Sequence, residues 1–320
     1  MKHKVMLIIM ASIMTFCSSC DYKDLEEPEF GNVEVVFDYT KVDSVPAAMR
    51  VVFYPVSGDA VDMIQQGYSL FDMNKNIKRV ELPEGVYDVY TWNNDGENVY
   101  EQNLVDRHSV FLTTDLSGFL AVGDDDQKST SIIDSIYNGQ KLRAAADYTV
   151  SGIVNNFHVD PLTSRQTVTL SCDSLVKRVN ITIKGVGGLG FVSMIKGTLN
   201  NVAEEVRVED GMVNDSVAVN FDCNWNTKEM TVTASFHVWD IQPSDAELSH
   251  KLVLFFWMDD AKVFYPIDIT KEVQEAYQKG GRIYNISKEV DINVRQGLGN
   301  DGGFDLKFDD WNDVEIEIPM

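Results

Sequence analysis

Long apolar segments are missing from this 320-residue sequence. No run reaches the 18 or more apolar residues that a membrane-spanning helix requires, so we expect only the N-terminus to associate with a lipid bilayer. Basic residues are also scarce, because 27 Lys and Arg stand against 50 Asp and Glu, for a formal net charge of −23. A field of this sign repels nucleic-acid phosphates and anionic lipid head groups. The composition therefore argues against a nucleic-acid partner.

Cysteine is rare as well, with four residues in the whole chain. Cys17 and Cys20 lie in an N-terminal export segment, which leaves Cys172 and Cys223 for the folded protein. Two cysteines are too few for a disulfide framework, and no Cys/His spacing typical of a zinc site is present. We expect two separately buried thiols, with a disulfide between them as the alternative.

The N-terminus has the pattern of an export signal. Lys2 and Lys4 precede the apolar run Val5 to Phe16, which is too short to span a membrane. Small residues lie directly before Cys20, an arrangement that resembles a bacterial lipobox. This resemblance implies that residues 1–19 are removed and that Cys20 is acylated with fatty acid such as palmitate. An ordinary secretory signal is the alternative.

The residues that follow Cys20 predict an extended tether over 20–30. Asp21 to Pro28 is polar and acidic. Acidic residues next to a lipidated cysteine resemble the surface-export signal of Bacteroidetes lipoproteins, which implies the outer face of the outer membrane. A solvated linker without export function is the alternative interpretation.

From Gly31 onward, short alternating apolar and polar runs are separated by turn residues, which indicates an all-β protein. Val33 to Tyr39 and Met230 to Val238 are examples, and each predicts a strand with one solvated face. One convincing helix is predicted over Thr270 to Lys279, stopped by two glycines. The pattern predicts two β-sandwiches over residues 31–147 and 148–320, with minor helical insertions.

Motifs associated with catalysis occur in unsuitable contexts. Gly185 to Gly190 matches the glycine-rich dinucleotide fingerprint, but it follows an alternating strand without a βαβ unit, so we expect a turn or bulge. Two Ser-x-x-Lys matches, beginning at Ser174 and Ser193, would need a helix to bring both side chains to one face, and we expect a strand for the first match. The histidines have no ligand spacing. The sequence therefore predicts neither an enzyme nor a cofactor or metal site.

Four Asp-Ser-apolar tripeptides resemble the O-glycosylation sequon of Bacteroides. Their serines are Ser44, Ser135, Ser174 and Ser216. A tripeptide this loose also occurs by chance in a chain rich in Asp and Ser. The sequons favour a location outside the cytoplasm.

The order of features resembles the fimbrillin-like lipoproteins of Bacteroidetes, in particular the fimbrium-anchor type and its Bacteroides relatives. Besides Cys20, the resemblance rests on Val33–Tyr39, Met49–Pro55, Leu82–Tyr90 with Asn93–Asn94, Leu175–Ile183 and Gly302–Trp311. It implies two tandem transthyretin-like β-sandwiches without catalysis. Stalk subunits of this family are cut at an Arg near the N-terminus, and no clear equivalent is present because Arg50 lies inside a predicted strand.

These observations predict a non-catalytic lipoprotein of the cell surface, held in the outer membrane through Cys20. Its role would be fimbrium anchoring, assembly or accessory adhesion, with fimbrillin-like subunits or other surface proteins as partners. Val314, Ile316 and Ile318 form an alternating segment that we predict to be available for strand exchange, with an internal edge strand as the alternative. A surface glycan-binding lipoprotein is the alternative function, and it would require exposed aromatic rings on a shared platform.

Overall fold

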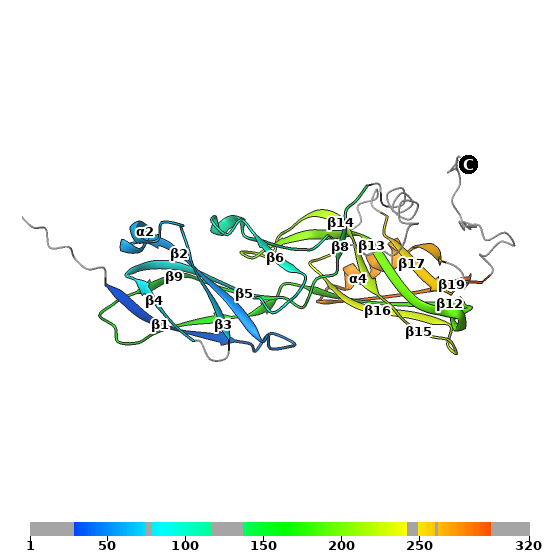
Figure 1. Ribbon diagram of the computed structural model, residues 1–320, viewed down its shortest axis with the longest axis horizontal. Coiled ribbons are helices and arrows are strands. Elements are labelled where there is room, and N and C mark those ends of the chain that lie inside the picture. Colours follow the sequence, from blue (N-terminus) through cyan, green and yellow to red (C-terminus); the bar gives the residue numbers. More distant parts are fainter. Residues whose placement is uncertain are drawn as a thin grey trace, which may run out of the picture.

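Strands dominate the chain, which confirms the all-β prediction (Figure 1). The computed structural model describes residues 29–74, 78–116, 137, 139–241, 249–259 and 262–295. Two β-sandwiches follow one another along the long axis of the molecule (Figure 1). None of the helices in these ranges is long and apolar enough to cross a membrane.

The N-terminal sandwich packs a three-stranded sheet on a five-stranded sheet. The smaller sheet has the order β10-β1-β4, in which β1 runs parallel to β10 and antiparallel to β4. The larger sheet has the order β11-β9-β5-β2-β3. The strand bounds are β1 Phe30–Asp38, β2 Ala48–Ser57, β3 Ser69–Asn74, β4 Arg79–Pro83, β5 Gly85–Asn93, β9 Val150–Val159, β10 Gln166–Ser171 and β11 Asp173–Ser174.

The C-terminal sandwich packs the four-stranded sheet β15-β16-β12-β19 on the sheet β18-β17-β13-β14-β8. A hairpin of β6 and β7 extends the second sheet, because β7 pairs with the end of β13. The strand bounds are β6 Val99–Gln102, β7 Phe111–Thr114, β8 Leu142–Ala144, β12 Lys177–Gly187, β13 Val192–Arg207, β14 Val213–Asp222, β15 Asn224–Asn226, β16 Thr231–Val238, β17 Lys251–Met258, β18 Lys262–Asp268 and β19 Ile283–Asn293.

Helices are few and short. The predicted helix is confirmed as α4, Thr270–Lys279, which buries Val273 and Ala276 and ends at Gly280 with a positive φ of 67°. A second helix, α2 (Asp59–Met63), lies between β2 and β3. Two single 3₁₀ turns, η1 (Arg107–Ser109) and η2 (Leu189–Phe191), complete the described elements.

Each sandwich has its own apolar core, and a third cluster joins the two. Val52 of β2 and Trp92 of β5 belong to this third cluster together with Leu112 of β7 and Val206 of β13. The β6–β7 hairpin and the end of β13 therefore cover the face of the five-stranded sheet that points away from its own core. Burial of apolar area of this kind ties the two sandwiches together.

Strand pairing cuts across the division expected between residues 147 and 148. β6, β7 and β8 precede that point but pair in a C-terminal sheet, whereas β9, β10 and β11 follow it and pair in the N-terminal sheets. The described chain thus crosses between the sandwiches after β5, after β8 and after β11. Alternation along a strand shows that a face is buried, but it does not show which sheet the strand joins.

Candidate functional site

The connection between β1 and β2 is held from both sandwiches. The backbone N–H of Asp43 donates to the Tyr148 hydroxyl at 2.9 Å, and the Tyr148 ring packs 5.6 Å from that of His237 on β16. A guanidinium N–H of Arg282, just before β19, donates to the carbonyl oxygen of Lys41 at 3.1 Å. The loop is therefore positioned by the C-terminal sandwich as well as by its own sheet.

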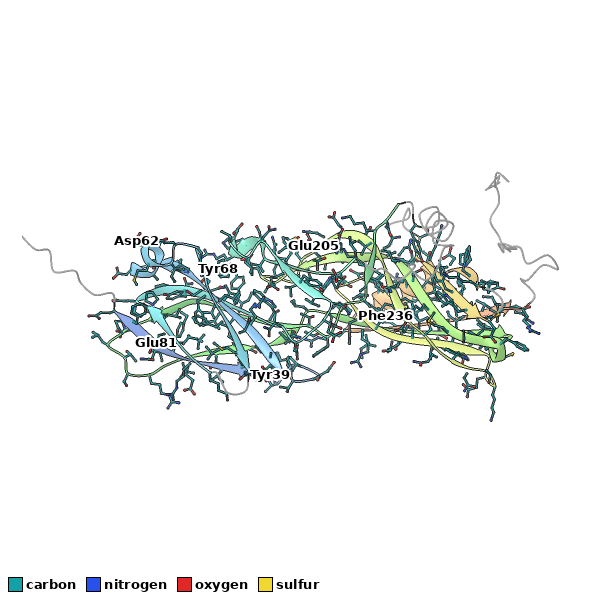
Figure 2. All side chains as sticks on the ribbon, viewed as in Figure 1. Tyr39, Asp62, Tyr68, Glu81, Glu205 and Phe236 are labelled. Carbon is teal, nitrogen blue, oxygen red and sulfur yellow. The ribbon has the colours of Figure 1, made fainter. Side chains whose placement is uncertain are left out.

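A cavity of about 350 Å³ lies beside this loop, at the end of β1 and β3. Met49 and Met73 form a buried part of its lining, and the rings of Phe37 and Tyr39 stack with centroids 5.9 Å apart. Figure 2 shows Tyr39 at the lower edge of the N-terminal sandwich, on the side of the C-terminal one. Val45 on the loop lines the cavity and is 60% exposed.

Within the described residues, the pairing of β1 with β4 ends just before the position of the cavity. The β1–β4 ladder ends at the pair Glu34 and Arg79, followed by one hydrogen bond from the Val35 N–H to the Lys78 carbonyl oxygen at 2.7 Å. β1 continues to Asp38, and Lys78 and Asn74 line the cavity there. Burial raises the pKa of Tyr39 to about 12, with the Cys172 and Asp95 charges adding to the effect. Ionisation of the Tyr39 hydroxyl therefore requires a still higher pH than that of an exposed tyrosine, which is itself protonated at neutral pH.

A second hollow of about 320 Å³ lies on the other side of Val45 and Pro46 and is rich in carboxylates. Asp95 accepts the Ala47 N–H at 2.6 Å, and Asp147 accepts two backbone N–H groups of residues 97 and 98 at 2.7 and 2.8 Å. These carboxylates organise the loops around them. Across the described ranges, no group of three or more His, Cys, Asp or Glu side chains is placed to hold a metal ion.

The sequon serines differ in accessibility. Ser44 is exposed in the β1–β2 loop. Ser174 donates to the Val176 carbonyl oxygen at 3.0 Å and accepts the N–H of the same residue at 3.3 Å. Ser216 accepts from the side-chain amide of Gln140 at 3.0 Å. Ser44 is therefore the one of these three that presents an exposed hydroxyl. Ser135, the lipidation residue Cys20 and the strand-exchange residues Val314, Ile316 and Ile318 lie outside the described residues.

The two remaining cysteines are separate and buried, as expected. Neither Cys172 nor Cys223 takes part in a disulfide. Burial raises the pKa of each thiol to about 12, and neighbouring carboxylates of Asp38 and Asp222 act in the same direction. Both sulfurs are therefore protonated and unreactive at neutral pH.

The glycine-rich motif is a bulge and a turn between sheets. Gly185, at φ 81°, sits where the register of β12 against β19 shifts, and Gly188 adopts a left-handed conformation before η2. This confirms the predicted turn. Of the Ser-x-x-Lys matches, Ser193 donates to the Trp257 carbonyl oxygen at 3.0 Å while Lys196 pairs with Asp222 at 3.5 Å. Both side chains are therefore engaged in contacts of the sheet.

The aromatic residues do not form a shared platform within the described chain. Trp92 and Trp239 are 1% and 3% exposed in the cluster that joins the sandwiches. Among the described residues, the exposed aromatic side chains belong to four different elements: Phe30 on β1, Tyr100 on β6, Phe191 on η2 and Tyr277 on α4. A flat sugar-binding surface, as the glycan alternative requires, is not assembled from them.

Comparisons with solved structures give the same architecture. A structure from Bacteroides ovatus described as a "putative adhesin" matches with a TM-score of 0.59 at 16% identity, over 86% of this chain and 96% of its own. The fimbrial anchor protein Mfa2 from Porphyromonas gingivalis matches with a TM-score of 0.44 at 13% identity, over 81% and 90%. The match to the Bacteroides ovatus structure confirms the expected resemblance at the level of the fold. A comparison with curated proteins gave no match.

A family model covers more than half of the sequence. Residues 19–222 match the model described as a domain of unknown function, DUF5119. The matched segment runs from the residue before Cys20 to the end of β14, so it includes the N-terminal sandwich and the β6–β7 hairpin. On this match, the chain belongs to the DUF5119 family.

Proposed function

We propose that this protein is a non-catalytic, lipid-anchored protein of the cell surface that serves in fimbrium anchoring, assembly or accessory adhesion. Cys20 carries the lipid and holds the chain in the outer membrane. The C-terminal sandwich is the part that meets other fimbrial or surface proteins.

The observation that carries this proposal is the placement of the two sandwiches along the long axis of the molecule. The described chain enters β1 at one end of the long axis, whereas the turn between β12 and β13 lies towards the other end (Figure 1). A lipid attached upstream of β1 holds the first end at the membrane. The C-terminal sandwich then projects away from the bilayer, where a partner reaches it.

The contacts between the two sandwiches favour a rigid molecule that can transmit force from the membrane anchor to a partner. Besides the shared apolar cluster, Arg50 of β2 pairs with Asp72 of β3 at 2.7 Å and with Glu101 of β6. This links the five-stranded sheet to the hairpin of the other sandwich. Several such contacts together favour a fixed angle between the domains over a flexible link.

The names of the structural neighbours point the same way. One matched structure is described as a "putative adhesin" and another as a fimbrial anchor protein. The acidic charge of the chain also suits an exposed role, since it disfavours non-specific adsorption to anionic surfaces.

The test combines acylation, retention in outer membranes and partner capture in a Bacteroidetes host. Wild type is compared with Cys20→Ala and with Cys17→Ala as the matched control. We expect Cys20→Ala alone to abolish fatty-acid labelling and to release the protein from outer membranes. Labelling lost in Cys17→Ala but kept in Cys20→Ala would place the lipid elsewhere.

Partner capture then tests the fimbrial role. An affinity tag inserted at Leu162, which is 87% exposed in the β9–β10 turn, leaves both ends of the chain free. We expect fimbrillin-like subunits to co-purify in stoichiometric amounts from gently solubilised outer membranes. If none co-purify, and if deleting the gene changes neither fimbriae nor cell adhesion, the proposed function is overturned.

A further inference from the structure

We propose that the cavity beside the β1–β2 loop binds a small apolar ligand that carries one negative charge, of the class of medium-chain aliphatic carboxylates. This site is distinct from the fimbrial role, and its test does not depend on that role.

The size and lining of the cavity suit a compact apolar ligand. Its volume of about 350 Å³ falls within the range of roughly 300 to 1,000 Å³ that is usual for ligand pockets. Met49 and Met73, which are 2% and 1% exposed, form its closed floor. The apolar side chains that present surface to an occupant are Val36 and Val45, which are 38% and 60% exposed. Apolar surface of this kind favours an apolar occupant over water.

The charge around the cavity favours a ligand with a negatively charged head group. Among the described residues that line it, Lys78 is the single charged one and no Asp or Glu occurs, although acidic residues outnumber basic ones by 50 to 27 in the chain. Lys78 takes part in none of the ion pairs formed by the described residues. The pKa of Glu34 is lowered chiefly by its hydrogen bond with Arg165, and the Lys78 charge contributes least, so Arg165 is the ion-pair partner of this carboxylate. The mouth of the cavity is therefore suited to an anion.

A hydroxyl donor adds to the cation. Tyr39 lines the same cavity, and its hydroxyl is protonated at neutral pH, as it is in any tyrosine whose pKa is not lowered. A protonated phenol donates a hydrogen bond to a carboxylate oxygen without adding repulsion. One ammonium, one hydroxyl and an apolar lining together match a molecule with an aliphatic body and a carboxylate end.

The test uses the mature chain with Cys20→Ser, so that no acyl chain is attached. Calorimetric titration with decanoate is compared with decyltrimethylammonium, which has the same chain and the opposite charge, and with butyrate, which lacks the apolar body. We expect decanoate to bind at one site, and the other two to bind at least tenfold more weakly. Equal binding of decanoate and decyltrimethylammonium would mean unspecific surfactant adsorption and would overturn the proposal.

Three variants locate the site. We expect Lys78→Glu to weaken decanoate binding at least tenfold, and Ala48→Phe, which fills the cavity from its lining, to abolish it. Lys184→Glu makes the same charge change on an exposed residue of β12 and should leave binding unchanged. Thermal unfolding of each variant confirms that it is folded. Undiminished binding in both Lys78→Glu and Ala48→Phe would overturn the proposal.

A peptide occupant is the competing outcome. An extended peptide that alternates apolar and acidic residues would be added in competition with decanoate. If this peptide displaced decanoate and bound at least a hundredfold more tightly, the cavity would be a peptide pocket and the small-ligand assignment would fall. Failure of the peptide to compete supports the assignment.

Discussion

The five-stranded N-terminal sheet and the four-stranded C-terminal sheet bury their strands differently. In the C-terminal sheet, β16 alternates between buried and accessible residues along most of its length, and β12 does so as far as the bulge at Gly185. In the N-terminal sheet, β5 is buried at nearly every position. Its odd-numbered residues Tyr87 and Val89 face the core of their own sandwich, whereas Tyr90 and Trp92 join the cluster beneath the β6–β7 hairpin.

This difference shows what a second layer does to a sheet. The four-stranded sheet has one apolar face to bury, so its sequence keeps the period of two. The five-stranded sheet lies between its own core and the β6–β7 hairpin with the end of β13, which belong to the other sandwich. Both faces of its central strands are therefore apolar. The N-terminal sandwich is thus completed by residues that belong to C-terminal sheets.

The largest effect should come from separating the sandwiches at the position that the sequence suggested. Residues 21–147 lack β9 to β11, and residues 148–320 lack β6 to β8. We expect each fragment alone to be unfolded, because each loses strands from its sheets and exposes part of a core. Circular dichroism and thermal unfolding would show this, and co-expression of both fragments is the control. A cooperative thermal transition in either isolated fragment would contradict the interleaved arrangement.

Substitutions on the outward faces of the two sheets should differ sharply. Trp92→Ala on β5 removes a side chain that is 1% exposed, and we expect a loss of about 3 to 5 kcal/mol in the free energy of unfolding. Thr233→Ala is the counterpart on the solvated face of β16 and should change stability by no more than about 0.5 kcal/mol. Urea unfolding measures both. Similar losses in the two variants would mean that the hairpin does not stabilise the N-terminal sheet.

The bulge at Gly185 provides a test within the C-terminal sheet. A Cβ at this position would overlap the carbonyl oxygen of Val290, and φ is 81°. We expect Gly185→Ala to destabilise the protein by about 2 to 4 kcal/mol, from backbone strain and overlap together. Gly190→Ala, where a Cβ meets no atom within 4 Å, should be neutral within about 0.5 kcal/mol. Equal stability of the two variants in urea unfolding would be inconsistent with the bulge geometry.

The smallest effect concerns a buried carboxylate on β13, the strand whose end helps to join the two sandwiches. Glu204 of β13 is 9% exposed. Burial alone would raise the pKa of its carboxyl group. Hydrogen bonds from Arg143 and Lys141 outweigh this effect and hold the pKa below its usual range. A lowered folded-state pKa stabilises the protein above the unfolded pKa near 4.5, and this contribution disappears as the pH falls through the folded value.

Glu204→Gln tests this contribution. We expect a loss of about 1 to 3 kcal/mol at pH 7 that shrinks towards zero as the pH is lowered. Glu34→Gln, at the more exposed pair with Arg165, is the control and should have a smaller effect. Unfolding curves at several pH values would decide, and a loss for Glu204→Gln that does not change with pH would contradict the assignment.

Sequence patterns predicted the local structure of this protein well. The strand at Val33, the helix Thr270–Lys279 and the glycine turn after β12 are all present, because alternation, capping and positive φ act over a few residues. The cavity beside Met49 and Met73 had no such signal. Its described lining comes from β1, β2, β3 and the β1–β2 loop, and no local pattern records that these segments meet.

The sequence by itself determined the all-β class, the acidic charge and the position of α4. It favoured separate thiols at Cys172 and Cys223 but left a disulfide open, and the structure decided between the two. Only the tertiary structure decided which sheet each strand joins, that the β6–β7 hairpin covers the N-terminal sheet, and that Ser44 is more accessible than Ser174 and Ser216. The reason is physical. The alternation of apolar and polar residues along a strand shows whether one of its faces is buried. The element that buries this face lies far away in the chain and is selected by packing.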